Sequence, residues 1–154
     1  MNKNKIISRL EEYFTGNAER FGIETAFLFG SSVKGNLRTD SDIDIGVVFH
    51  EKGFSDEYTF SVINEISLDL LQKLNIDIDV VPVYKDFRKP MLYYNIIVQG
   101  KPIYIEDFDK YISIKNEAMF QMEDFSLFGE KWQYDISKQR IGELNNAGFR
   151  ICKR

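Results

Sequence analysis

The sequence predicts an α/β fold of the α+β type, in which a small mixed β-sheet carries helices packed on one face. Apolar residues recur at helical spacing in several long segments, and short apolar runs lie between those segments. Because 154 residues with 44% hydrophobic content are enough for one core, we expect a single domain over residues 1–154. Its core should cover about 20–107, with a C-terminal helical extension over 108–154.

The helices and strands are expected to alternate along the chain. In order, the predicted elements are a helix at 3–20, strands at 25–29 and 41–49, a helix at 57–74, a strand at 76–83, a helix within 87–100, a short strand at 101–107, and helices at 109–123 and around 134–146. Both of the first two helices carry apolar residues every three or four positions. Gly22 ends the first helix, and Ser55 or Asp56 is a suitable N-cap for the second.

The strand assignments depend on short apolar runs bounded by turn residues. The run TAFLF at 25–29 is apolar throughout and ends at Gly30. The runs SDIDIGVVF and IDIDVVPV alternate instead, with isoleucine and valine on one face and aspartate on the other. Pro82 places the end of the third strand at a sheet edge or a bulge. Pro90 and Gly100 mark the start and the end of the following helix.

Composition and charge narrow the classes of function. The net charge of −4 and the pI of about 5.1 argue against broad, nonspecific nucleic-acid binding, so we expect no stable nucleic-acid complex. The one cysteine cannot form an internal disulfide, and no Cys/His cluster is present to hold zinc. Neither a signal peptide nor an apolar run long enough for a membrane span is found. We therefore expect a cytoplasmic protein without membrane contact.

Acidic residues occur in pairs on two of the predicted strands. Asp42 and Asp44 project from the same side of their strand, and Asp77 and Asp79 repeat this arrangement. If the two strands are neighbours, three or four carboxylates meet, and they would repel one another without a cation. Oxygen ligands without histidine or cysteine favour Mg²⁺ or Mn²⁺ over zinc. The sequence therefore predicts a divalent metal site on the acidic face.

The turn after the first strand offers a place for an anion. Gly30 allows a backbone to approach a ligand closely, and the amide groups after it can cradle a phosphate, with the Ser31 hydroxyl as a further donor. Lys34 or Arg38 could reach a phosphate, although either could equally be a solvated loop charge. A phosphate cradle beside an acid cluster indicates a metal–nucleotide site.

The same stretch resembles the nucleotidyltransferase superfamily built on the DNA polymerase β-like palm. Gly30-Ser31, ten intervening residues, and then Asp42-Ile43-Asp44 match the pattern G-S-x-x-x-G-x(5)-S-D-I-D without a gap, and Ser41 precedes the first aspartate as is common in that family. The small size, together with PMLYYNIIVQGKPIYIED after the third strand, resembles the minimal nucleotidyltransferases, or MNT proteins, which act as antitoxins of HEPN-domain toxins.

The resemblance implies a set of roles as well as a polymerase β-like fold. It implies that Asp42, Asp44 and Asp79 are the catalytic and metal-binding acids, with Asp77 as a competitor for the third place. It implies two Mg²⁺ ions, ATP as substrate, and nucleotide contacts from Gly30, Ser31, Lys34 and Ser41. Many relatives carry arginine at the position of Lys34, so the bidentate grip on phosphate is lost here. For the antitoxin group, the resemblance implies transfer of AMP to a tyrosine hydroxyl of the HEPN toxin.

Several alternatives remain open at this stage. The protein could be a non-catalytic antitoxin that covers its partner, or a transferase acting on a small molecule such as an aminoglycoside, although little chain is left for the additional domain of those enzymes. The acids could form a solvated outer face of a strand. Phe125, Phe128 and Trp132 could form a partner surface, but a core or a covering flap is the commoner role of aromatic residues. His50 is given no catalytic role.

Overall fold

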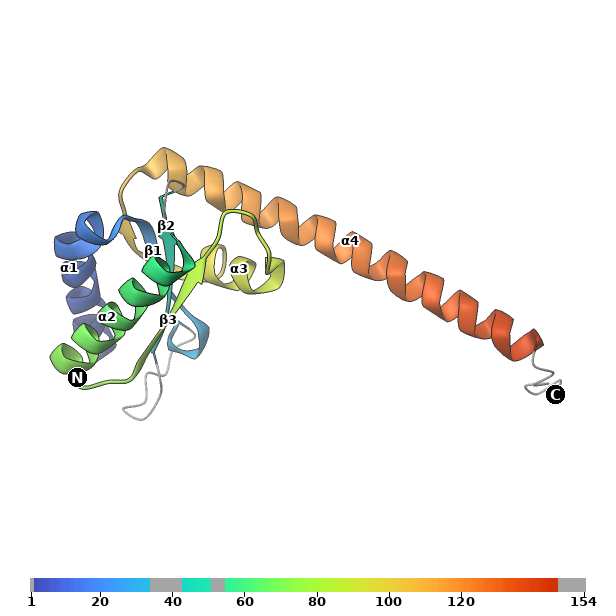
Figure 1. Ribbon diagram of the computed structural model, residues 1–154, viewed down its shortest axis with the longest axis horizontal. Helices are drawn as coiled ribbons and strands as arrows, with labels where there is room; N and C mark the ends of the chain where they lie inside the picture. The colour runs from blue at the N-terminus through green and yellow to red at the C-terminus, as the bar shows by residue number, and fades with distance from the viewer. Residues whose placement is uncertain (1, 34–42, 51–54, 147–154) are drawn as a thin grey trace.

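The computed structural model in Figure 1 shows a four-stranded mixed sheet with helices packed against it. The structure describes residues 2–33, 43–50 and 55–146. The strands β1 (Ile23–Phe29), β2 (Ile43–Phe49), β3 (Ile78–Val83) and β4 (Lys101–Ile105) lie in the order β3-β2-β1-β4. β1 is antiparallel to both β2 and β4, whereas β2 and β3 are parallel. The predicted fold class is confirmed.

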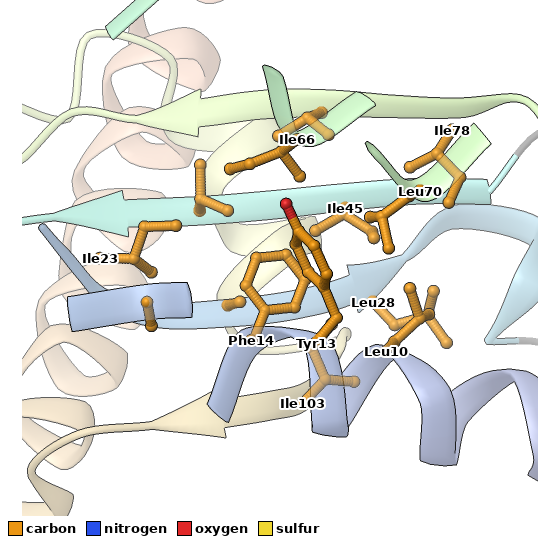
Figure 2. Close-up of a cluster of buried hydrophobic side chains, with 14 of the residues drawn as sticks. Leu10, Tyr13, Phe14, Ile23, Leu28, Ile45, Ile66, Leu70, Ile78 and Ile103 are labelled. Atoms are coloured by element: carbon orange, nitrogen blue, oxygen red, sulfur yellow. The ribbon is translucent and has the colours of Figure 1, made fainter. Parts of the chain in front are cut away.

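One face of the sheet is covered by α1 (Lys3–Phe21) and α2 (Asp56–Leu74). Their apolar stripes meet alternate residues of the strands, and Figure 2 shows Leu10, Phe14, Ile45 and Ile66 in this cluster. Both helices begin at a polar cap: Asn2 accepts a hydrogen bond from the Lys5 amide for α1, and Ser55 accepts one from the Tyr58 amide for α2. Of the two predicted N-caps of this helix, Ser55 and Asp56, the structure shows Ser55.

The opposite face is covered by α3 (Pro90–Ile97) and by the first turns of α4 (Phe108–Asn146), which corrects the expectation that helices pack on one face only. Phe27, Val48, Ile96 and Tyr111 belong to this second cluster. The physical reason lies in β1, in which every residue is buried, because a strand that is apolar on both sides needs a cover on both sides. The acids consequently share a face with α3 instead of having a face of their own.

The C-terminal helix is longer than the sequence predicted. The expected helices at 109–123 and around 134–146 are one continuous helix of 39 residues, α4, which extends far beyond the body of the molecule in Figure 1. Gly129 does not interrupt it, because a single glycine costs a helix interior only about 1 kcal/mol and proline is absent from this segment. In the part of the chain that the structure describes, no helix is sufficiently long and apolar to cross a membrane.

The sheet edges agree with the proline positions. β3 and β4 are the outer strands, so Pro82 lies in an edge strand, as predicted. Gly100 follows α3 at a point where an added Cβ would meet the carbonyl oxygens of Ile96 and Leu28, so no larger residue fits. This close contact joins the end of α3 to the sheet just before β4 begins.

Candidate active site

The end of β1 and the start of β2 bring a backbone bend against a carboxylate. Phe29 pairs with Asp44 across the antiparallel strands, and Gly30 follows with a φ of +79°. A Cβ placed on Gly30 would lie 2.5 Å from Oδ2 of Asp44, far inside an ordinary contact distance. Glycine is required here for two reasons, the left-handed backbone and the closeness of the carboxylate. The Gly-Ser bend and the acid of the sequence motif are thus in direct contact.

Asp79 lies beside Asp44, on the neighbouring strand β3. Asp44 and Asp79 are register partners in the parallel pairing of β2 and β3. Partners of this kind project to the same face, with their strands about 4.8 Å apart. Asp44 is partly buried and Asp79 is exposed. Two negative charges at about 5 Å repel by roughly 1–3 kcal/mol for an effective dielectric between those of water and a protein surface, which favours a cation between them.

The two candidates for the third acid, Asp77 and Asp79, have different places relative to β3. Asp79 lies within β3, next to Asp44. Asp77 precedes the strand, and its carbonyl oxygen accepts a hydrogen bond from the Ile43 amide at 3.1 Å. Both side chains are exposed, so burial does not distinguish them. The register makes Asp79 the direct neighbour of Asp44, and the choice between Asp77 and Asp79 as the third metal-binding acid stays a prediction.

Of the remaining predicted site residues, the structure describes only Ser31. Ser31 is exposed in the short 3₁₀ turn Gly30–Ser32 that follows β1. Lys34, Arg38, Ser41 and Asp42 lie outside the described residues, so their predicted roles stay predictions. The structure therefore brings together Gly30, Ser31, Asp44 and Asp79 at one end of the sheet, while the first acid of the motif has no described position.

Two small residues that support this corner escaped the sequence reasoning. Ser32 is buried, and its Oγ donates a hydrogen bond to the Phe29 carbonyl oxygen at 3.1 Å, which fastens the bend to the end of β1. Gly46 follows Asp44 on the same face of β2, and an added Cβ there would meet Ile96 of α3. The glycine lets α3 pack directly beside the acidic corner. Its signal in the sequence was an isolated glycine inside a strand pattern.

The donor set fits a hard divalent cation. Asp44 and Asp79 offer carboxylate oxygens, which Mg²⁺ and Mn²⁺ prefer. Among the described residues, no group of three or more histidine, cysteine, aspartate or glutamate side chains is arranged to hold a metal ion. Asp42, the third acid expected here, is not in that part of the chain. The two described acids therefore fit part of a magnesium site and leave room for a further ligand.

An open groove borders Asp79 on the side of α2. It has a volume of about 660 Å³ and lies between α2 and the edge strand β3. Phe60 and Ile63 of α2 line it on one side, and Pro82 and Tyr84 line it on the other. A substrate could approach Asp79 along this edge, because no further strand pairs with β3 among the described residues.

A second polar cluster lies at the opposite end of β1 and β2. The carboxylate of Glu24, almost fully buried, accepts a hydrogen bond from Lys85 Nζ at 2.8 Å, and His50 Nε2 lies 2.7 Å from a carboxylate oxygen of Glu106. Gly30 is six positions after Glu24, so this cluster is about 20 Å from the bend along the strand. His50 consequently takes no part in the acidic corner.

Comparisons with known proteins agree with this geometry. The family "Polymerase beta, Nucleotidyltransferase" matches residues 4–109. A crystal structure of a toxin–antitoxin with AMP-PNP contains a chain 22% identical to this one, with a TM-score of 0.62, covering 89% of this chain and 99% of that one. Crystals of the toxin–antitoxin MntA-HepT contain a chain with 16% identity and a TM-score of 0.61, covering 87% and 98%.

A third structure, of a tri-AMPylated Shewanella oneidensis HEPN toxin in complex with an MNT antitoxin, matches with 16% identity, a TM-score of 0.59, and coverage of 85% and 98%. No curated protein sequence matches significantly. Identities this low establish a common fold, here the polymerase β-like nucleotidyltransferase fold that the sequence predicted. Because the family match spans more than half of the sequence and contains Gly30, Asp44 and Asp79, the chain belongs to the polymerase β nucleotidyltransferase family.

Proposed function

We propose that this protein is a minimal nucleotidyltransferase that uses Mg-ATP to transfer AMP to a tyrosine hydroxyl of a partner HEPN toxin, and so acts as its antitoxin. The observation that carries the proposal is the contact of the Gly30 bend with Asp44, which in turn lies beside Asp79. Support also comes from the similar chains, which were crystallised in toxin–antitoxin complexes, one with AMP-PNP and one with an AMPylated HEPN toxin.

The backbone bend would bind the phosphates of the nucleotide. The amides that follow Gly30 and the exposed hydroxyl of Ser31 are donors for phosphate oxygens, and Lys34 and Ser41 complete the predicted cradle. A side chain at residue 30 would fill the space in front of Asp44. The glycine therefore keeps phosphate and carboxylate close enough to act together.

The transfer step exchanges one phosphorus–oxygen bond for another. The hydroxyl oxygen of the acceptor tyrosine attacks the α-phosphorus of ATP, and the bond from this phosphorus to the bridging oxygen of the β-phosphate breaks, so that pyrophosphate leaves. A tyrosine hydroxyl has an unperturbed pKa near 10 and needs a base at neutral pH. Asp79 is exposed beside Asp44 and would accept the proton.

Asp42, Asp44 and Asp79 would hold the magnesium ions. Bound at these carboxylates, Mg²⁺ or Mn²⁺ would neutralise phosphate charge and would lower the pKa of the acceptor hydroxyl. The groove between α2 and β3 reaches Asp79 from the solvent side and could admit the acceptor segment. We therefore expect the nucleotide on the Gly30 side of Asp44 and the acceptor on the Asp79 side.

The test compares conservative variants in a labelling assay. The purified protein is incubated with α-labelled ATP, Mg²⁺ and a candidate HEPN toxin, and AMP on the toxin is measured by gel and by mass spectrometry. Asp44→Asn and Asp79→Asn should each lower the labelling rate at least about 100-fold, since a lost general base alone costs 10²–10⁴. Asp77→Asn is the matched control, a carboxylate two residues from Asp79, and should keep most of the activity.

Two results would contradict the proposal. Equal labelling by wild type and Asp44→Asn would mean that the acidic corner does not carry the reaction. Full neutralisation of the toxin in cells by the Asp44→Asn/Asp79→Asn variant, with no AMP on the toxin, would support a non-catalytic antitoxin that only covers its partner. If Asp77→Asn is inactive and Asp79→Asn is active, the roles of these two acids are exchanged.

A further inference from the structure

The groove between α2 and β3 is lined by acids and by no cation. Asp56, Glu57 and Asp79 belong to its lining, and all three side chains are exposed. No lysine or arginine is among the described residues that line it. Carboxylates without cations beside them attract a positively charged occupant and repel an anion such as a second nucleotide. The groove therefore fits a basic ligand.

The two walls of the groove run in opposite directions. β2 and β3 are parallel and α2 connects them, so α2 returns along β3 against its direction, as Figure 1 shows. Asp56 and Glu57, in the first turn of α2, therefore lie towards Tyr84 at the end of β3. Ser67 lies towards Asp79. From Glu57 to Ser67 the helix rises about 15 Å, and from Asp79 to Tyr84 the chain extends about 17 Å, so the groove has the length of about five extended residues.

The backbone of β3 offers hydrogen-bonding groups along this groove. The carbonyl oxygen of Asp77 accepts a bond from the Ile43 amide of β2, so residue 77 and every second residue after it direct their backbone groups towards β2. Val80 and Pro82 direct theirs the other way, to the edge at which no further strand pairs among the described residues. An extended segment can both donate to and accept from Val80, whereas Pro82 can only accept, because proline has no N–H.

An exposed aromatic side chain lies between the two ends of the groove. Phe60 is 67% exposed and lines the wall opposite Pro82, with the half-buried Ile63 next to it. Aromatic side chains in such a position are frequent anchors in interfaces. Asp79 lines the groove and is also the register partner of Asp44. The groove and the acidic corner thus share a residue, and a chain bound in the groove reaches the proposed site of transfer.

We propose that the acceptor segment of the partner binds in this groove as an extended strand, with its tyrosine at Asp79 and a lysine or arginine about five residues away, at Asp56 and Glu57. This inference rests on the proposed function, because it describes the segment that receives AMP. Between the two ends, the segment pairs with the backbone of Val80, and one of its apolar side chains packs on Phe60. A second copy of this chain is a poorer occupant, since two such grooves would bring like charges together.

The first experiment measures AMP transfer to a candidate HEPN toxin at saturating Mg-ATP over a series of toxin concentrations. Glu57→Lys should lower kcat/KM for the toxin at least about tenfold at low salt, because it sets like charges against each other. Most of this loss should disappear at about 0.5 M salt, since charges this exposed are screened. The KM for ATP should stay within about twofold of wild type. Glu11→Lys is the matched control: it reverses an exposed charge on α1, away from the groove, and should leave these constants unchanged. Circular dichroism confirms that each variant retains its helices.

Charge exchange and hydrogen exchange test the two kinds of contact. Each lysine and arginine within about seven positions of the AMPylated tyrosine of the toxin is replaced by glutamate in turn. One of these changes should lower kcat/KM with the wild-type protein and restore it with Glu57→Lys, because opposite charges meet again. Amide hydrogen exchange in the complex, measured by NMR without ATP, tests the backbone. Exchange of the Val80 amide should slow at least about tenfold, whereas the Val81 amide, which points to β2, should not change.

Three outcomes would overturn the inference. Wild-type kcat/KM for the toxin in Glu57→Lys would mean that the acidic wall does not bind the acceptor. A loss that persists at high salt, or that appears in the KM for ATP, would show damage to the site instead of a lost ion pair. Unchanged exchange of the Val80 amide in the complex would exclude pairing with β3. In all three cases the wild type still transfers AMP, so the proposed function stands, whereas no transfer by the wild type would refute the proposed function itself.

Discussion

A single added methyl group at Gly30 should damage the site more than the fold. In Gly30→Ala, the backbone at φ +79° becomes unfavourable by roughly 1–2 kcal/mol for a residue with a Cβ. The new Cβ would start 2.5 Å from Oδ2 of Asp44, so that carboxylate has to move by about 1 Å to reach an ordinary contact. Reduced freedom of the unfolded chain returns about 0.4–1 kcal/mol. We expect a net loss of about 0.5–1.5 kcal/mol in the free energy of unfolding.

The effect on catalysis should be larger, because a displacement of about 1 Å in a catalytic group can cost 100-fold in rate. Urea denaturation measures the stability, and transfer of labelled AMP measures the rate at a temperature at which the variant is fully folded. Gly16→Ala is the matched control. Gly16 lies in α1 with no atom within 4 Å of an added Cβ, so alanine there should stabilise the protein by about 0.5–1 kcal/mol and leave the rate unchanged.

The two measurements together decide whether the reasoning holds. Wild-type activity in Gly30→Ala, with the expected loss of stability, would mean that the position of Asp44 does not limit the reaction. If Gly30→Ala also has wild-type stability, the bend accepts a side chain without strain. The contact between Gly30 and Asp44 would then constrain neither the fold nor the site. Loss of activity in Gly16→Ala would show that the assay reports general damage.

Three smaller changes test the packing around the sheet. Tyr13→Phe removes the hydrogen bond to Asp69 and should cost about 1–2 kcal/mol at neutral pH. Burial raises the pKa of Tyr13 above its usual 10.0, and the pKa values of Tyr93 and Tyr104 are raised as well, so urea denaturation should show both proteins losing stability as pH rises past 10, the wild type more than the variant. Lys85→Met leaves Glu24 buried with a lost partner and should cost about 1–3 kcal/mol, measured in the same way. Ser55→Ala removes the cap of α2 and should lower the free energy of unfolding of the protein by about 1 kcal/mol, measured by thermal denaturation.

The order and type of the core elements could be predicted because each one carries a strong local signal. Helical spacing of apolar residues located α1 and α2, and the alternating runs located β2 and β3. The layer arrangement could not be predicted as easily. In the sequence, a short strand buried on both faces is recognised only because its apolar residues do not alternate with polar ones, and TAFLF has this continuous apolar pattern. The pattern indicated that both faces of the sheet are covered, although helices were expected on one face only.

For the site, the motif spacing predicted that the Gly30 turn and the carboxylates belong to one site. In the structure Gly30 and Asp44 lie close together, because an antiparallel turn returns the chain to its starting level, and the roles of both residues stay predictions. The choice between Asp77 and Asp79 could not be made, because it depends on the register of β3 against β2, a contact between segments more than 30 residues apart. The single helix α4 was predicted as two because Gly129 and the mixed polar and apolar residues around it interrupt the helical spacing in the sequence.

The acidic corner also explains how the sheet tolerates its own charges. Ile43 and Ile45, on either side of Asp44, are fully buried in the cluster under α1 and α2, and this packing fixes β2 at the position that brings Asp44 beside Asp79. On the opposite face, Gly30 leaves space beside the carboxylate of Asp44, and Gly46 leaves space for Ile96 of α3. The repulsion of roughly 1–3 kcal/mol between the two acids is small compared with burial of these isoleucines, each contributing about 1.5–3 kcal/mol. The fold can therefore hold the acids together before a cation arrives, and binding of Mg²⁺ should raise the stability of the protein by relieving that repulsion.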